Sequence, residues 1–580
     1  MPLEDKPTAG YITSLRTHMK DVWANTWADW ELRDSYYFQT YALWPEALKG
    51  RPVYHPGHSR SVVNNAGDHQ VAFDPKPHRF PAGEGEEHKL RADRVERYLK
   101  AVFEEAALLD KGITWKAVGK NLVHLGYVVV EGPVLDQRER PKKPVKRDGE
   151  SGDEYESRLV LWENEKKTWM PFRIRVPHPA TVLLDPEEKR PRFAIKHAYR
   201  YSQALHDITS KRKGRRRRDV EVWQVGENPH ALVMCDEFWT KEWHALMVSP
   251  DDEGTPRSNQ GGVGGGSGGE DGLLLVERNV WGFVPFEHAF AGWGQEPTAQ
   301  GQHDPVYLTA GILTGEMESL KLEAQEMASQ HNALVEAAFD PLMTTEDPAE
   351  LAAQLARGDI ARVADKSTVW RLEVPQLPSW LGDSMGRIAR DIEQGTMSQS
   401  LGGQRQVGVS TVGQEAILST AAAHKFVGIN KQMEYLATNL AGNVLRLVDV
   451  LDETLYCRGF TIRPSDIEHD YSAQVEFMLV DPVLKLQEEE LGLLQVQAGL
   501  LSKETYWSAK SRLEDASGER QRLLEDAVRA HPVVVAFLAG KAAEGMGLED
   551  LAALLVGTGE GPGGPSPSGL LGPDGQPMLG

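Results

Sequence analysis

The stretch from Asp304 to Leu451 constrains this chain more than any other part, because three helical patterns there are separated by two gaps of different composition. The first pattern opens at Asp304-Pro305, an acceptor side chain followed by a residue without an amide hydrogen, which is typical of a helix start. We therefore expect an amphipathic helix over residues 304–332. Its apolar residues recur at steps of three and four: Leu313, Met317, Leu320, Ala324 and Met327.

The second and third patterns are also one-faced, but they differ greatly in length. The third begins with a capping box at Thr411 and continues to residue 452. At 1.5 Å per residue an unbroken helix of that kind would be roughly 60 Å long, which exceeds ordinary globular helices. The second spans residues 376–395 and ends at Gly395, a residue suited to a left-handed cap. Its apolar stripe consists of Leu381, Met385, Ile388 and Ile392.

The two gaps between these helices carry patterns of their own. Residues 333–375 contain a short helix that starts at Asp347 and ends at Gly358, and then a strand from Thr368 to Val374. Residues 396–410 are polar and rich in glycine, with Arg405 as their only charged residue. We expect this second gap to be an exposed, mobile loop.

Upstream of this stretch the pattern indicates helices followed by strands. Gly126 separates a helical pattern from a β-branched run, and from Phe172 onward apolar and polar residues alternate. Such alternation favours an antiparallel sheet with one solvated face. Near the N-terminus Trp23, Trp27 and Trp30 lie on one helical face, which we expect to pack on the body or on a neighbouring subunit. Together these patterns predict an α+β fold.

The order of helix, small α/β insert, helix, polar loop and very long helix resembles the stem, clip, stem, tunnel loop and kinked helix of tailed-bacteriophage portal proteins, the head-to-tail connectors. The passage around Gly126, and the strand closing on Asp185-Pro186 before Tyr201-Ser202, resemble the portal wing. The resemblance implies an N-terminal aromatic-rich arm (1–89), a wing (90–303) with a flexible Gly-rich loop (259–269), stem helix 1 (304–332), a clip (333–375), stem helix 2 (376–395), a tunnel loop (396–410), a long kinked helix (411–452), wing return strands and a helix (453–500), crown helices (501–556) and a disordered tail (557–580).

In function the resemblance implies a ring-shaped channel, dodecameric in the family, at one capsid vertex, through which double-stranded DNA is packaged, retained and ejected. It implies a location in the virion, and in the host cytoplasm during assembly. Expected partners are further copies of the chain, the major capsid or scaffold protein, the terminase large subunit and a head-completion or tail adaptor protein. The resemblance also implies that the tunnel loop faces the DNA with Gln399, Gln404, Arg405 and Gln406. Amide side chains can touch phosphates without holding them.

The charge of the chain restricts how it could bind nucleic acid, and the distribution of charge adds one candidate contact. The net charge of −21 argues against a protein that grips nucleic acid over a broad surface, although an acidic lining suits a conduit through which DNA slides. One basic cluster interrupts the wing, and we interpret it as a solvated loop tip or as a contact with nucleic acid or with an acidic neighbouring subunit. It consists of Lys211, Arg212, Arg215, Arg216, Arg217 and Arg218.

The sequence contains no phosphate loop, zinc-protease, serine-hydrolase or calcium-loop signature. The histidines between residues 51 and 90 match no zinc spacing, and Cys235 and Cys457 alone cannot form a disulfide framework or a thiolate zinc site, which favours a reducing compartment. We therefore expect no enzymatic activity, no cofactor, no metal and no membrane span. Two alternatives stay open: a structural or scaffolding subunit of another large assembly, and a hydrolase with a scattered carboxylate site.

Overall fold

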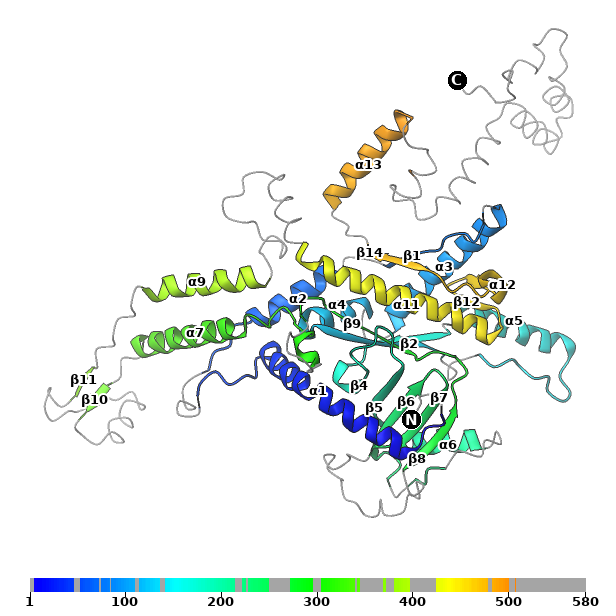
Figure 1. The fold of residues 1–580 in the computed structure, drawn as a ribbon, viewed down its shortest axis with the longest axis horizontal. Helices are drawn as coiled ribbons and strands as arrows, with labels where there is room; N and C mark the ends of the chain where they lie inside the picture. The colour runs from blue at the N-terminus through cyan, green and yellow to red at the C-terminus, as the bar shows by residue number, and fades with distance from the viewer. Residues whose placement is uncertain are drawn as a thin grey trace, which may run out of the picture. The chain divides into compact units, whose positions relative to one another are not determined.

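The chain has an α+β fold, seen in a computed structural model in which every described strand pair is antiparallel (Figure 1). It divides into two compact units, residues 1–479 and 480–580, and α13 (Pro482–Gln497) is the described helix of the second. The structure describes residues 5–45, 53–71, 75–83, 85–109, 114–135, 141–169, 171–213, 222–225, 228–249, 272–295, 304–338, 342–344, 369–371, 380–396, 424–477, 482–499 and 506.

Two antiparallel sheets, of three and five strands, form most of the described β structure of the first unit. The three-stranded sheet has the order β3-β2-β9, with β2 (Tyr127–Leu135) between β3 (Phe172–Arg175) and β9 (Phe286–Phe290). The alternation from Phe172 onward thus predicted the strand type correctly, although residues 222–225, where the pattern also favours a strand, are not in one. The five-stranded sheet follows the chain in order: β4 (Val182–Leu183), β5 (Phe193–Tyr201), β6 (Leu232–Thr240), β7 (Trp243–Val248) and β8 (Leu273–Arg278).

Helix α1 (Ala9–Phe38) packs its aromatic face into a core shared with strands of both sheets. The Trp23 and Trp30 side chains are almost completely buried, and Trp27 is partly buried beside them. The indole of Trp23 donates to the Leu184 carbonyl at 3.0 Å, and that of Trp30 to the Leu125 carbonyl at 2.9 Å. These contacts confirm that the three tryptophans share one face, and they show that this face packs on the body of its own chain.

Gly126 turns the chain from helix α4 (Thr114–Leu125) into strand β2, as the sequence predicted. Its φ of +71° lies in the left-handed region, where a side chain is unfavourable. A Cβ at this position would also lie 2.4 Å from the carbonyl of Thr309. Only glycine therefore fits between the helix, the strand and the segment that leads to α7.

Helix α11 (Val427–Leu451) lies at the centre of the largest core cluster, and one of its faces is completely buried. It packs beside α4 and strand β14 (Gln474–Phe477), which pairs with β1 (Pro75–His78). Helices α2 (His58–Val71) and α3 (Glu86–Leu109) contribute to the same core cluster. A 3-10 turn, η5 (His424–Phe426), precedes it, so the α-helix begins at Val427 rather than running unbroken from Thr411; residues 411–423 lie outside the described part.

The strands after α11 do not rejoin the wing sheets, contrary to our expectation. Strands β12 (Leu455–Cys457) and β13 (Phe460–Ile462) pair with each other, and β14 pairs with β1. The remaining described helices of the first unit are short or peripheral: α5 (Gly152–Thr168), α6 (Ser202–Lys213), α12 (Pro464–Ile467) and the 3-10 turn η2 (Pro179–Thr181).

Helices α7 (Met317–Ala338) and α9 (Trp380–Gly395) form a separate pair, with β10 (Leu342–Thr344) and β11 (Val369–Arg371) between them in the sequence. The first helix was expected from Asp304, but α7 begins at Met317. Asp304 instead caps the 3-10 turn η3 (Pro305–Tyr307), where its side chain accepts from the Val306 amide at 3.0 Å. Leu313 is buried, but it lies in the turn before the helix.

Candidate functional site

Helices α7 and α9 run antiparallel as a hairpin that leaves the body of the first unit and returns to it (Figure 1). The Ser384 hydroxyl donates to Glu326 at 2.9 Å, while Gly395, at the other end of α9, approaches Glu316 at the start of α7. Ile388 and Ile392 are buried in the contact. Each helix therefore places one narrow apolar stripe against the other.

The inner end of α7 is covered by the segment that follows α1. Leu43 forms a small buried cluster with Ala324 and Ala328, and the Gln325 side chain donates to the Leu43 carbonyl at 2.8 Å. Alanine at two adjacent turns lets this segment approach the helix closely. The N-terminal arm thus supports the base of the hairpin.

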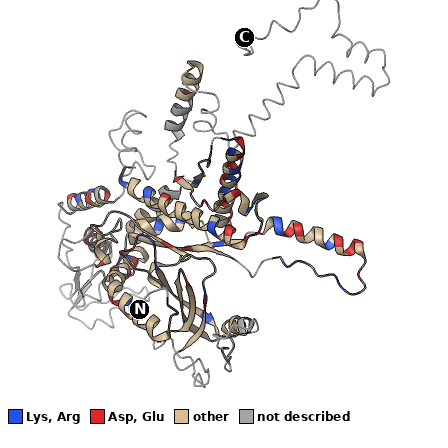
Figure 2. Ribbon diagram, turned by 45° about the vertical axis from the view of Figure 1, so that its right-hand side comes forward, with Lys and Arg blue, Asp and Glu red and all other residues tan. Residues whose placement is uncertain are grey.

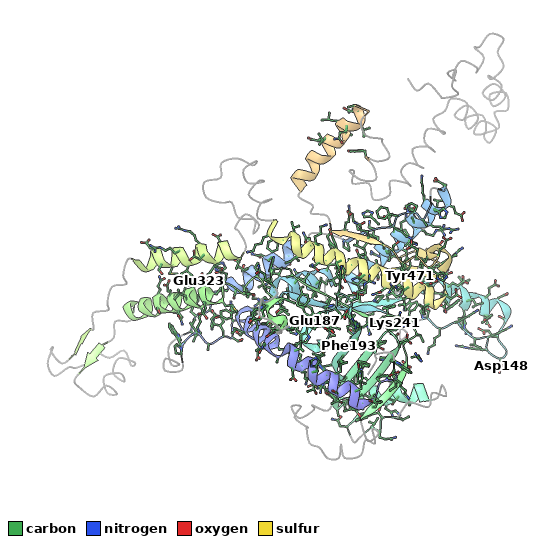
Figure 3. All side chains as sticks on the ribbon, in the orientation of Figure 1. Asp148, Glu187, Phe193, Lys241, Glu323 and Tyr471 are labelled. Atoms are coloured by element: carbon green, nitrogen blue, oxygen red, sulfur yellow. The ribbon has the colours of Figure 1, made fainter. Side chains whose placement is uncertain are left out.

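Three glutamates of the hairpin keep carboxylate oxygens away from solvent. Glu323 on α7 is 7% exposed and lies 3.4 Å from the Nδ1 of His58 (Figure 3). Glu323, Glu326 and Glu393 each have one buried oxygen without a hydrogen-bond partner in the described part of the chain. The Glu323 hydrogen bond raises the pKa of His58 despite burial, and the charge of Glu393 acts in the same direction.

Lys425 ties the end of α9 to the start of α11. Its Nζ donates to the Thr396 carbonyl at 2.7 Å and also to that of Gly395, and burial lowers its pKa. The Trp293 indole donates to the Lys425 carbonyl at 3.3 Å and holds this junction against the body. The two ends of the segment 397–423, which contains most of the polar loop, are therefore close in space.

The residues that the sequence predicted as sites are mostly beyond the described part of the chain. Gln399, Gln404, Arg405 and Gln406 lie in residues 397–423, which the structure does not describe. Lys211 and Arg212 lie in the last turn of α6, and the rest of that basic cluster, Arg215, Arg216, Arg217 and Arg218, falls outside the described residues. Their proposed roles stay predictions.

A basic groove that sequence reasoning missed lies between the two sheets. Its cavity measures about 230 Å³, and we define the groove by its four cations: Arg173 and Arg175 of β3, and Lys196 and Arg200 of β5. The sequence does contain a signal for this groove: on each predicted strand two cations are two or four residues apart. Residues at these spacings face the same side of a sheet. The packing of the two sheets, which brings β3 and β5 to one groove, is not evident from either segment alone.

Two buried carboxylates offset part of this positive charge. Glu131 accepts from Lys196 at 2.6 Å, and Glu237 accepts from Arg200 at 2.8 Å. Burial raises the pKa of Glu237, but the hydrogen bond from His244 and the charge of Arg200 outweigh it, so the pKa lies well below its ordinary value. Glu237 is thus anionic near neutral pH, and Lys196 and Arg200 are each paired with a carboxylate inside the groove.

A second cavity, of about 340 Å³, lies along the polar face of α11 beside Tyr471 (Figure 3). Asn439 and Asn443 line it, and their side-chain amides donate to the buried Glu287 carboxylate at 3.2 and 2.8 Å. Burial raises the pKa of Glu287 in spite of these bonds. The amides therefore fix α11 on strand β9 and leave little hydrogen-bonding capacity for a ligand.

Metal ligation and membrane crossing find no support in the described ranges. Within them no three His, Cys, Asp or Glu side chains are grouped so as to hold a metal ion. Cys235 and Cys457 are buried free thiols, and burial raises the pKa of Cys457 to about 12. No helix among the described residues combines the length and apolar character needed to cross a bilayer.

No family model and no curated protein matches the chain. Among solved structures it is similar to a chain of the assembly titled "Virion of native gene transfer agent (GTA) particle". The two sequences are 10% identical, the alignment covers 79% of this chain and 94% of that chain, and the TM-score is 0.29.

Proposed function

We propose that this chain is the subunit of a portal, a ring-shaped channel at one vertex of a phage-like capsid. The observation that carries the proposal is the α7–α9 hairpin, whose return is tied by Lys425 to the start of the buried helix α11. In chain order this gives a helix, an insert with a strand pair, a returning helix, a segment that contains the polar loop and whose two ends are held together, and a long core helix. That order supports a stem, clip, tunnel loop and kinked helix.

A hairpin of this kind needs neighbours. Only Ile388 and Ile392 are buried among residues 383–393 of α9, while Leu322 on α7 is 46% exposed. Two helices that share one narrow stripe cannot enclose a core, so further apolar contacts have to come from other molecules. Copies repeated about an axis supply them and close a ring.

In such a ring the loop that follows Thr396 would face the axis. Gln399, Gln404 and Gln406 would offer amides to passing double-stranded DNA, and one Arg405 per subunit would give a sparse ring of positive charge. A sparse ring centres a polyanion without trapping it. The acidic balance of the chain, −21, supports the same interpretation, because an acidic wall repels the phosphates.

The loop is tested by replacing residues 399–406 with a glycine linker of equal length. We expect rings of unchanged size and a loss of DNA packaging or retention, measured as nuclease-protected DNA per particle. The matched control replaces residues 259–269 by an equally flexible linker, which we expect to leave packaging unchanged. Normal packaging by the 399–406 variant would remove this loop from the mechanism.

The insert between α7 and α9 is the proposed clip, which meets the terminase large subunit and later the tail adaptor. Strands β10 and β11 pair over three residues each and would form its base. Deleting residues 339–375 should abolish both dockings in a pull-down with either partner while α1, α4 and the sheets keep their fold. Adaptor binding by a ring without the insert would refute the assignment.

A further inference from the structure

The cavity along the polar face of α11 is lined by two arginines, Arg190 and Arg446, and by no carboxylate of the described residues. Helix α11 carries few charged residues along its length (Figure 2), and Arg446 is the one that lines the cavity. Arg190 comes from the segment between β4 and β5. Two cations that are far apart in the sequence therefore meet at one cavity.

The guanidinium group of Arg446 has hydrogen-bond donors that the chain does not use. Arg446 is half-buried and lies over the ring of Tyr471, with 5.5 Å between its Cζ and the ring centroid. None of its five N–H groups has an acceptor among the described residues. A cation that is partly removed from water without acceptors is costly. The cavity is therefore suited to a group that supplies them.

Two carboxylates close to the cavity are already occupied. Glu287 accepts from the two asparagine amides of α11, and Asp449 accepts from the Tyr471 hydroxyl. Burial raises the pKa of Glu287, and the charges of Arg190 and Arg446 act in the opposite direction, so both guanidinium groups lie near it. Neither carboxylate is bonded to an arginine of the described chain. The acceptors for Arg446 have to come from another molecule.

The walls of the cavity are fixed before any ligand arrives. Arg190 donates to the Asn439 side chain at 2.9 Å, which holds one cation beside α11. On the other wall, a Cβ on Gly442 would lie 3.2 Å from the carbonyl oxygen of Tyr471, so glycine lets this segment pack close to the helix. A site whose walls are already ordered loses little conformational freedom on binding.

Phe80 supplies an apolar surface at the open side of the cavity. Its side chain lines the cavity and is nevertheless 73% exposed. The neighbouring Arg79 donates to the Ile467 carbonyl at 3.1 Å and lies 3.4 Å from Asp470, which fixes the backbone that carries the ring. An exposed aromatic ring next to unused guanidinium donors is suited to a ligand with an apolar part and an anionic part.

We propose that this cavity binds a small monocarboxylic acid with an apolar body. Arg446 and Arg190 donate to its carboxylate, because guanidinium groups match the two oxygens of that group, and Phe80 contacts its apolar body. The volume of about 340 Å³ lies in the range of small-ligand sites. A doubly charged phosphate is less suited, because Glu287 and Asp449 place negative charge nearby. The inference does not depend on the proposed ring.

Titration of benzoate into the full-length chain tests the site, with binding followed on the ligand by saturation-transfer NMR. We expect saturable binding by the wild type. Benzamide has nearly the same shape without the charge, so it should bind about tenfold or more weakly. Arg446→Gln should weaken benzoate binding by a similar factor. Arg446→Lys should lie between the two, because lysine keeps the charge and loses the fork of donors.

Two further variants separate the site from general effects of charge and folding. Arg278→Gln is the matched control, because Arg278 also lies over an aromatic ring, 4.3 Å from that of Trp243, but is outside the cavity. It should leave benzoate binding unchanged. Phe80→Ser alters an exposed side chain, so the fold is kept, and it should remove the advantage of benzoate over acetate. Circular dichroism and the unfolding midpoint check the fold of each variant.

Each contrary result overturns the site and leaves the portal proposal standing, because no readout depends on assembly. One such result is a wild-type chain that shows no saturable binding of benzoate. Another is an equal loss of binding in Arg446→Gln and Arg278→Gln, which would indicate a general charge effect. Benzamide that binds as well as benzoate would show an apolar surface without a carboxylate site.

Discussion

Arg16 and Asp236 form an ion pair deep inside the first unit, with both side chains almost fully buried and 3.1 Å between Nε and Oδ2. Arg16 also donates to Ser249 at 2.8 Å, and His197 contacts the other oxygen of Asp236. The pair joins α1 to the five-stranded sheet. Removing one partner of such a pair leaves a buried charge without compensation.

Arg16→Met should therefore lower the free energy of unfolding by about 3 to 5 kcal/mol. The matched control is Arg192→Met, because Arg192 is 66% exposed and its ion pair with Glu188 is on the surface. That substitution should cost less than about 1 kcal/mol. Chemical denaturation followed by tryptophan fluorescence measures both, and equal losses would contradict the role assigned to the buried pair.

Gly126 combines a left-handed backbone with a close approach to another segment. Gly126→Ala should cost about 2 to 4 kcal/mol, the sum of an unfavourable φ and a clash with the Thr309 carbonyl. Gly149→Ala is the control, since Gly149 has a φ of +84° and a Cβ added there would meet no atom within 4 Å. It should cost about 1 kcal/mol. A thermal unfolding series would show whether the clash accounts for the difference.

At the scale of elements, His58 links α2 to Glu323 on α7. The contact raises the pKa of His58, so protonated His58 stabilises the fold below the ordinary histidine pKa of about 6.5. This contribution is lost as pH rises through the raised pKa. Wild type should exceed His58→Gln in unfolding free energy by up to about 1 kcal/mol at pH 5.5 and by nothing at pH 9.

The exposed His18→Gln provides the control for that measurement, because His18 has no ion-pair partner among the described residues. Its difference from wild type shows what replacing a histidine by glutamine costs where no such contact is lost. If the His58→Gln difference were the same at pH 5.5 and pH 9, the contact between α2 and the hairpin would not involve a charged histidine.

Element type was predictable from the sequence wherever a local pattern determines it. The tryptophan face of α1, the glycine turn before β2 and the one-faced hairpin helices follow from residue spacing alone. Element ends were less predictable. Asp304 does act as a cap, but it caps a 3-10 turn and not helix α7. The helix begins later, because the chain that starts at Gly311 first packs against α4.

Long-range pairing was not predictable by these means. Nothing local to residues 474–477 shows that they pair with residues 75–78 rather than with the wing sheets. The basic groove was missed for the same reason, since its cations come from strands that are separate in the sequence and meet only in the fold. The tunnel-loop residues Gln399, Gln404, Arg405 and Gln406 stay a sequence prediction.

For the whole molecule, the portal proposal depends on a hairpin that is incomplete in a single copy. Among residues 383–393 of α9 only Ile388 and Ile392 are buried, and Leu322 on α7 is 46% exposed. Packing against copies of α7 and α9 would complete the apolar contacts.

The most direct test is electron microscopy of the purified full-length chain, combined with a mass measurement. The portal proposal predicts closed rings with an open central hole and a mass that is a whole multiple of 64.4 kDa, with α7 and α9 lining the bore. Monomers at all protein concentrations, or particles without a central opening, would contradict it.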